Sequence, residues 1–171
     1  GNGTVCALRA DNTVACTGYL DPEYGPVRSG AFTGITIDKV MCGLRPGGRV
    51  ECWGSFDYGL QGEADYRQVV VDYDDVCGLR WDGSVSCSDS NDQPEGFFQY
   101  LAMEGFSACG IRLDGSLACW NAFGPVTSDL PPDGSFKAMS MNDTYACAID
   151  SEDELQCWGS VPDSLPAGKF Q

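Results

Sequence analysis

Ten cysteines are the residues of this chain whose type and spacing could do chemistry. They fall into five pairs, and nine residues separate the two members of every pair. Such pairs could hold metal ions or form disulfides. Zinc sites favour closely spaced cysteines or histidine ligands, and the chain has no histidine. We therefore expect no metal and five disulfides, namely Cys6–Cys16, Cys42–Cys52, Cys77–Cys87, Cys109–Cys119 and Cys147–Cys157.

Disulfides at this density indicate an oxidising compartment, so a secreted or cell-surface location is expected. No stretch is apolar over the length of a membrane helix, and no signal peptide is recognised. We expect a mature soluble form, or a piece of a protein anchored elsewhere, with no membrane insertion within this chain.

The residue types give catalysis little support. Without histidine, neither a Ser-His-Asp nor a Cys-His arrangement can form, and the cysteines are expected to be bridged. Two carboxylates acting on a glycoside stay compatible with the composition, but no two acids stand at a defined separation. We predict that the protein is not an enzyme and uses no cofactor.

The elements that position the cysteines are predicted to be β-hairpins. An aliphatic residue stands two positions after the first cysteine and another two positions before the second, which places all four on one face. Three residues connect the strands, and the last is of a type that tolerates positive φ. These residues are Asn12, Gly48, Gly83, Gly115 and Asp153. Counting outward from a hydrogen-bonded pair such as Arg80 and Ser84, the two cysteines lie opposite each other in a non-hydrogen-bonded pair.

A second pattern precedes four of the hairpins, an aromatic residue followed at +3 and +5 by apolar residues, and it predicts one more strand per unit. The aromatic residues are Phe32, Tyr66, Phe98 and Phe136. The residue after the first cysteine is always small and Trp often follows the second, so both hairpin faces are expected to be buried.

Short strands repeated every 32–38 residues predict an all-β fold, a small β-propeller of five blades with one hairpin disulfide per blade. We expect a single domain over 1–171. Its repeats are centred on 6–16, 42–52, 77–87, 109–119 and 147–157. Because Phe170 begins another aromatic strand and the chain starts inside a unit, the two termini are expected to complete one blade jointly.

The repeated sequences CGLRWDGSVSC and CGIRLDGSLAC, each preceded by the aromatic strand, resemble the regulator-of-chromosome-condensation repeat. The resemblance is to its cysteine-bearing form, found in bacterial surface proteins and in Crinkly-type plant receptor kinases. The matching segments are 41–54, 76–87, 108–120 and 146–159, with 5–18 weaker because Thr17 stands where Trp is usual. The resemblance implies a β-propeller, although family members usually have seven blades.

The charge is strongly one-sided, with 10 basic and 25 acidic residues and a net charge of −15. Proteins that bind nucleic acid neutralise phosphates with basic residues, so no nucleic acid partner is expected. Some members of the family that this chain resembles act on nuclear GTPases and chromatin. An acidic chain dense in cysteines suits neither that compartment nor that partner.

Arginine follows the aliphatic residue of the first strand in four units. These are Arg9, Arg45, Arg80 and Arg112. Circular repetition would set them in a ring near the hairpin tips, as a site for an anion or carboxylate. The alternative, which we favour, is local pairing with acids of the hairpin loops, because exposed pairs of this kind are common and weak. These acids are Asp11, Asp82 and Asp114.

Several other residues are candidates for contact or modification. Trp81 lies in a predicted hairpin tip where nothing obvious buries it, so it is the best single candidate for a contact residue. Aromatic residues of the inter-unit loops are further binding candidates, although the alternative that they hold the loops on the propeller rim is favoured. They are Tyr19, Tyr24, Phe56 and Tyr58. Asn2 and Asn142 begin glycosylation sequons. An acidic run at 72–75 could bind calcium but lacks the EF-hand spacing, so a solvated loop is expected.

The function predicted from these features is a non-enzymatic extracellular interaction platform that binds protein partners or assembles with itself. One alternative is a lectin that binds glycans through loop aromatics. A second is a secreted protein inhibitor of a hydrolase.

Overall fold

The predicted hairpins are present in the computed structural model, which describes residues 5–18, 29–38, 40–53, 60, 65–72, 75–88, 95–105, 107–121, 124–125, 130–166 and 168–170. The chain divides into two compact units, Gly1–Ser90 and Asn91–Gln171, which we describe separately. All regular structure among the described residues is β-strand, as predicted. No helix in this described part is long and apolar enough to cross a membrane.

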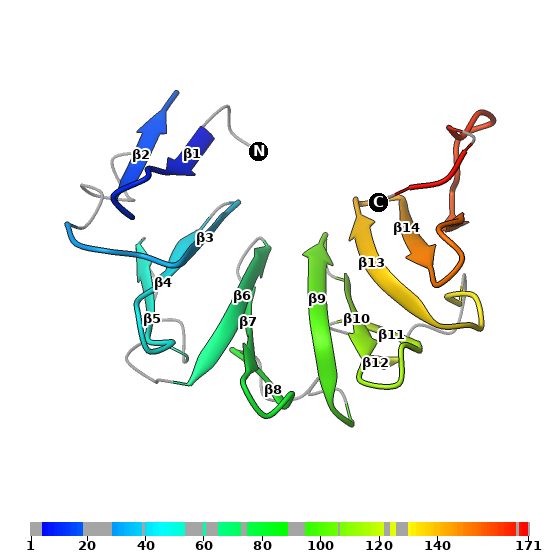
Figure 1. The fold of residues 1–171 in the computed structure, drawn as a ribbon, viewed down its shortest axis with the longest axis horizontal. Coiled ribbons are helices and arrows are strands. Elements are labelled where there is room, and N and C mark those ends of the chain that lie inside the picture. Colours follow the sequence, from blue (N-terminus) through cyan, green and yellow to red (C-terminus); the bar gives the residue numbers. More distant parts are fainter. Residues whose placement is uncertain are drawn as a thin grey trace. The chain divides into compact units, whose positions relative to one another are not determined.

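The first unit contains three antiparallel sheets, drawn in blue, cyan and green in Figure 1. Its strands are β1 (Val5–Leu8), β2 (Val14–Thr17), β3 (Gly34–Ile37), β4 (Met41–Leu44), β5 (Val50–Trp53), β6 (Tyr66–Asp72), β7 (Asp75–Arg80) and β8 (Val85–Cys87). The sheet orders are β1-β2, β3-β4-β5 and β6-β7-β8. Each sheet is therefore built from consecutive strands, as expected of a propeller blade.

The second unit contains two more sheets of the same kind. Its strands are β9 (Phe98–Glu104), β10 (Ser107–Arg112), β11 (Leu117–Asn121), β12 (Gly124–Pro125), β13 (Phe136–Met141), β14 (Tyr145–Asp150) and β15 (Leu155–Gly159). The orders are β12-β11-β10-β9 and β13-β14-β15. The short strand β12 was not expected from the sequence.

The hairpin register follows the prediction. Arg80 N–H donates to Ser84 O at 2.9 Å and Gly83 N–H donates to Arg80 O at 3.0 Å, which closes the three-residue loop. The last loop residue has positive φ in all five hairpins, from 63° at Asn12 to 91° at Gly83. Cysteines face each other across every hairpin with Cα atoms 4.0 Å apart, and all five predicted disulfides are present.

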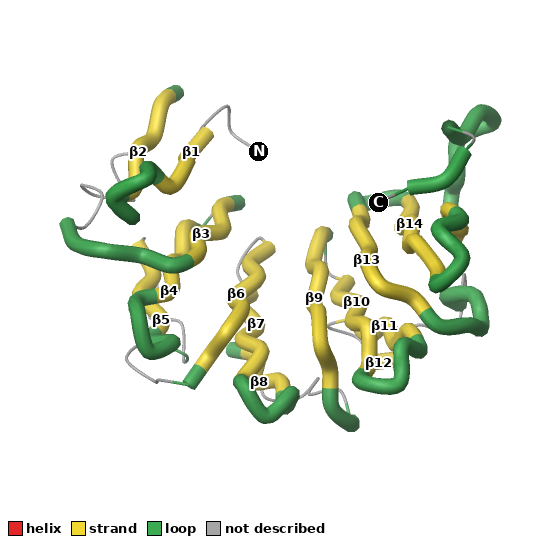
Figure 2. The backbone as a smooth tube through the Cα atoms, in the orientation of Figure 1, coloured by secondary structure: helices red, strands yellow, loops and turns green. Residues whose placement is uncertain are grey.

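The four upstream strands also form where the aromatic pattern predicts them, beside the first strand of each hairpin (Figure 2). In β6, β9 and β13 a register shift follows the aromatic residue, for example between Tyr66 and Gln68, whereas Phe32 precedes β3. A bulge adds one residue to the strand, and this extra residue brings the aromatic and the apolar residues at +3 and +5 to the same face. Accordingly Tyr66, Val69 and Val71 are all buried.

The apolar core of each unit lies between neighbouring blades. In the first unit, Cys42 and Cys52 pack in one cluster with Tyr66, Val69 and Val71 of the following sheet. In the second, Cys109 and Ile111 cluster with Phe136, Met139 and Ala148. The disulfides therefore act as core side chains as well as cross-links.

A backbone hydrogen bond joins each described hairpin tip to the aromatic residue of the next repeat in the same unit. Asn12 O accepts from Phe32 N–H at 2.8 Å, and Gly48 O accepts from Tyr66 N–H at 3.0 Å. Gly115 O and Asp153 O accept in the same way from Phe136 and Phe170. Phe170 thus makes the same tip hydrogen bond as a repeat's first aromatic residue, although the described residues 168–170 form no strand. Joint completion of one blade by the two termini stays a prediction.

Candidate functional site

The hairpin tips, which we define as residues 10–12, 46–48, 81–83, 113–115 and 151–153, are held rigidly at their backbones. Four tips accept the bond from the next repeat, and the tips 81–83, 113–115 and 151–153 also bond to their own blade. Trp81 N–H donates to Asp65 O at 3.1 Å, and Leu113 N–H donates to Phe97 O at 3.1 Å. With a disulfide closing the same hairpin, a tip has little conformational freedom left to lose on binding a partner.

The loop aspartates stabilise three of the tips from within. Asp82 Oδ1 accepts from the N–H of Ser84 at 2.8 Å and from its hydroxyl at 2.7 Å. Asp11 with Thr13, and Asp114 with Ser116, repeat this arrangement. In the last hairpin Asp150 accepts from the N–H groups of Glu152 and Glu154 instead.

These hydrogen bonds lower the pKa of each carboxyl, because they stabilise the ionised form. For Asp82 the Ser84 hydroxyl is the main cause of the lowered pKa, the Ser84 N–H follows, and the charge of Arg80 contributes less. The pKa values of Asp11, Asp114 and Asp150 are lowered too, with the largest contributions from Thr13, Ser116 and Glu154 respectively. The tips therefore stay anionic at neutral pH.

Three of the arginines make contacts that were not expected from the sequence, and their pairing with these aspartates stays a prediction. Three arginines lie over the aromatic ring at the start of their own blade. The guanidinium carbon is 3.9 Å from the ring centroid for Arg45 over Phe32, 4.7 Å for Arg80 over Tyr66 and 5.6 Å for Arg112 over Phe98. The charges of Arg80 and Arg112 each contribute to the lowered pKa of the aspartate in the same hairpin, while Oδ1 of that aspartate accepts from the loop.

Further contacts fix these arginines in place. Arg45 pairs with Glu51 at 2.7 Å and donates to Ala31 O and Ser29 O. Arg80 donates to the hydroxyls of Tyr66 and Ser86, both at 2.8 Å. Arg9 donates to the Thr13 hydroxyl at 3.5 Å. Through these contacts the guanidinium groups of Arg45, Arg80 and Arg112 are bound to other residues of their own blade. They do not support a binding site for a free anion.

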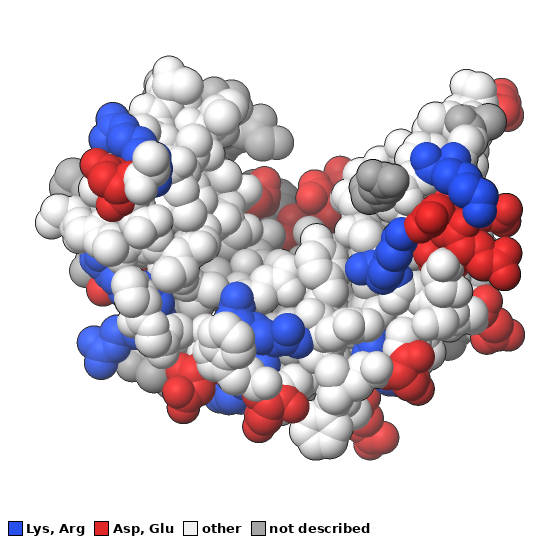
Figure 3. Space-filling view, viewed as in Figure 1, with Lys and Arg blue, Asp and Glu red and all other residues white. Residues whose placement is uncertain are grey.

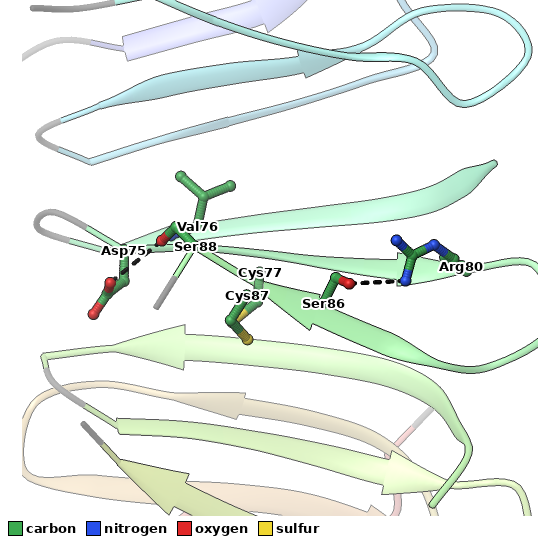
Figure 4. Close-up of a disulfide and its surroundings, with 7 residues drawn as sticks. All are labelled: Asp75, Val76, Cys77, Arg80, Ser86, Cys87 and Ser88. Atoms are coloured by element: carbon green, nitrogen blue, oxygen red, sulfur yellow. Dashed lines mark hydrogen bonds between the residues drawn. A yellow bond between two sulfur atoms is a disulfide. The ribbon is translucent and has the colours of Figure 1, made fainter. Parts of the chain in front are cut away.

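Sequence reasoning missed the aromatic partner because it lies on another strand. The signal was present, since Phe32, Tyr66 and Phe98 each belong to a unit that carries the arginine. Figure 4 shows the arrangement around the Cys77–Cys87 disulfide, with Arg80 reaching Ser86 on one side. At the other end Ser88 Oγ accepts from Val76 N–H at 3.0 Å and lies 3.3 Å from Asp75 Oδ1.

The side chains that the tips expose differ between repeats. The first tip residue is Ala10, Pro46, Trp81, Leu113 or Ser151. Trp81 is 71% exposed and Leu113 is 62% exposed. Phe97, whose carbonyl accepts from Leu113 N–H, is 56% exposed, so the second unit also exposes large apolar side chains near a tip. Within each unit, the face drawn in Figure 3 carries both acidic and basic side chains among uncharged surface.

Other predicted residues fall outside the described part. Tyr19, Tyr24, Phe56, Tyr58 and Asn2 are among them. Two members of the acidic run, Tyr73 and Asp74, are as well. Asp72 is buried, so its side chain does not belong to a solvated loop, contrary to that expectation. No group of metal-ligating side chains suited to hold an ion occurs among the described residues.

No protein-family model and no curated protein matches the chain. Solved structures do. The Crinkly WD40 ectodomain of the Arabidopsis thaliana receptor kinase ACR4 is 27% identical, with a TM-score of 0.77 over 98% of this chain and 66% of that one. The entire ectodomain of the Physcomitrella patens receptor kinase CR4 is 25% identical, with a TM-score of 0.78 over 98% of this chain and 53% of that one.

Prp20p from Saccharomyces cerevisiae shares the fold at 11% identity, with a TM-score of 0.67 over 92% of this chain and 56% of that one. The chain thus spans between half and two thirds of the length of the two ectodomains. Five blade-like sheets, each with its hairpin disulfide, accompany these similarities. The chain is a β-propeller array of cysteine-bearing repeats like those of the regulator of chromosome condensation.

Proposed function

We propose that the chain is a non-enzymatic extracellular module that binds a protein partner through its hairpin tips. The observation that carries the proposal is the 71% exposure of Trp81 on a tip whose backbone is held rigidly. Exposed tryptophan on a rigid frame is typical of interface hot spots, because a large apolar area is buried at little entropic cost. The five disulfides and the similarity to receptor ectodomains support the extracellular placement.

The variation among the tips favours one protein interface over repeated sugar sites. A lectin with one pocket per blade needs equivalent side chains at equivalent positions. Here the frame repeats while the first tip residue changes from Ala10 to Trp81 to Ser151. Binding energy would therefore be concentrated at Trp81 of the first unit, and the anionic Asp82 beside it favours a partner with basic residues at its rim.

The test measures binding of the labelled chain to the surface of cells from the source organism. Trp81→Ala should weaken binding about 30-fold, the effect of losing a hot-spot side chain. Leu165→Ala is the matched control, because Leu165 is also an exposed apolar residue but lies outside the tips. Protease treatment of the cells should remove the sites.

Equal binding by wild type and the Trp81→Ala variant would refute the proposed interface. Binding that survives protease and is displaced by free sugar would establish the lectin alternative instead. Concentration-dependent sedimentation of the chain alone, abolished by Trp81→Ala, would identify the partner as a second copy.

A further inference from the structure

We propose that Asn142 carries an N-linked glycan and that this glycan marks the end of its blade opposite the docking tip. Asn142 opens the sequon Asn142-Asp143-Thr144 in the turn between β13 and β14. All three residues of this turn are exposed. The inference rests on the extracellular placement proposed above, because oligosaccharide transfer to asparagine takes place in the secretory pathway.

The side chain of Asn142 is oriented by its own turn. Oδ1 accepts from Thr144 N–H at 2.8 Å, from Tyr145 N–H at 3.0 Å and from the Thr144 hydroxyl at 3.0 Å. Two backbone donors determine which end of the amide is oxygen, since an NH₂ group could not accept from them. Nδ2, the atom that a glycan would occupy, then has no partner among the described residues.

Contacts of the turn with its surroundings also leave the side chain of Asn142 exposed. Asp143 lies beside Gly105 of the neighbouring blade in the same unit, and its Oδ1 would be 3.0 Å from a Cβ placed there. Asn142 N–H donates to Tyr145 O at 3.0 Å, which ties the turn to β14. The sequon is therefore held in one conformation with its acceptor nitrogen accessible.

The reaction transfers an oligosaccharide from a polyprenyl diphosphate donor. Nδ2 of Asn142 bonds to the anomeric carbon of the first sugar, the bond from that carbon to the diphosphate oxygen breaks, and the diphosphate leaves as an anion. The proton that Nδ2 loses passes to a base of the transferase. No residue of this chain is oxidised or reduced.

The glycan would leave the docking tip of this blade open. β14 connects the turn at Asn142 to the tip at 151–153 and has six residues. At about 3.3 Å per residue, the two ends of the strand lie roughly 17–20 Å apart. Glycosylation would thus shield the turn end of the blade and restrict protein docking to the tip end.

The test is secretion of the full chain from eukaryotic cells in an Asn2→Gln background, which removes the other sequon. Intact mass should show a surplus in sugar-sized steps that a peptide N-glycosidase removes. Thr144→Ser should keep the surplus. Asn142→Asp should lose it while preserving the turn, because aspartate retains the Oδ1 acceptor.

A secreted, fully disulfide-bonded chain without surplus mass would overturn the glycan proposal and leave the extracellular function standing. Failure of every variant to be secreted would count against both the glycan proposal and the extracellular function. Weaker cell-surface binding after Asn142→Asp would refute the separation of glycan and tip, and unchanged binding would support it.

Discussion

Gly78 should be intolerant of alanine, although its backbone does not require glycine. The residue lies in β7, and its φ is outside the positive range. An added Cβ would stand 2.5 Å from both Cδ1 and Cε1 of Tyr66. The ring is 1% exposed and lies under Arg80, so it cannot swing into solvent.

The size and sign of the effect follow from two opposing contributions. Without a clash, Gly→Ala would stabilise the protein by about 0.4–1 kcal/mol, because alanine restricts the unfolded chain. Ordinary carbon contacts need about 3.5–4 Å, so the ring would have to move roughly 1 Å within a packed core. Overpacking of this kind costs about 1–3 kcal/mol. Subtracting the gain from the cost, we expect Gly78→Ala to lower the free energy of unfolding by about 1 kcal/mol, and by no more than about 2.6 kcal/mol.

The assay is urea denaturation without reductant, followed by tryptophan fluorescence and circular dichroism. Gly34→Ala is the matched control, because Gly34 also lies in a strand but its nearest neighbour, Leu44 Cδ1, is 3.8 Å from the added Cβ. That control should be neutral or stabilising. If Gly78→Ala is as stable as wild type or more stable, the close approach of the Tyr66 ring does not explain why a small residue stands at this position.

The remaining predictions concern the hairpin, its arginine and its tip. Replacing Cys77 and Cys87 by alanine should cost about 3 kcal/mol in urea denaturation, since the bridge closes a loop with a separation of 10 residues; a negligible change would contradict the loop-entropy account. Arg45→Ala should cost about 1–3 kcal/mol through loss of the Phe32 and Glu51 contacts, whereas exposed Arg49→Ala should stay within about 0.5 kcal/mol. Because the pKa of Asp82 is lowered from its ordinary 3.8, its stabilising contribution is present above that pH and is lost as pH falls through the folded value. Asp82→Asn should therefore show its largest stability deficit near neutral pH, and a deficit that persists undiminished in acid would be inconsistent with this linkage. Trp81→Ala should change the free energy of unfolding by less than about 0.5 kcal/mol, because the side chain is exposed, and a larger loss would mean that it is packed in solution.

Much of the blade was predictable because its determinants are local. Alternation over a few residues, a loop ending in a residue that tolerates positive φ, and two cysteines at one spacing together specify a hairpin register. Asn12 and Asp153 show the strength of this reasoning, since both adopt positive φ as predicted although neither is glycine. The partner of Arg80 was not predictable in the same way, because Tyr66 is 14 residues away on another strand.

By itself, the sequence determined the repeat, the disulfide pairing and the acidic surface, since periodicity, covalent bonds within ten residues and formal charge depend on no distant contact. The tertiary structure decided which side chains make contacts within the blade and which stay exposed to a partner. Arg45 and Arg80 are held against aromatic rings, whereas Trp81 on an equally rigid tip stays exposed. Exposure depends on surfaces that remote segments bring together. The sequence therefore suggested Trp81 as a contact residue, and only the tertiary structure showed that its side chain is exposed.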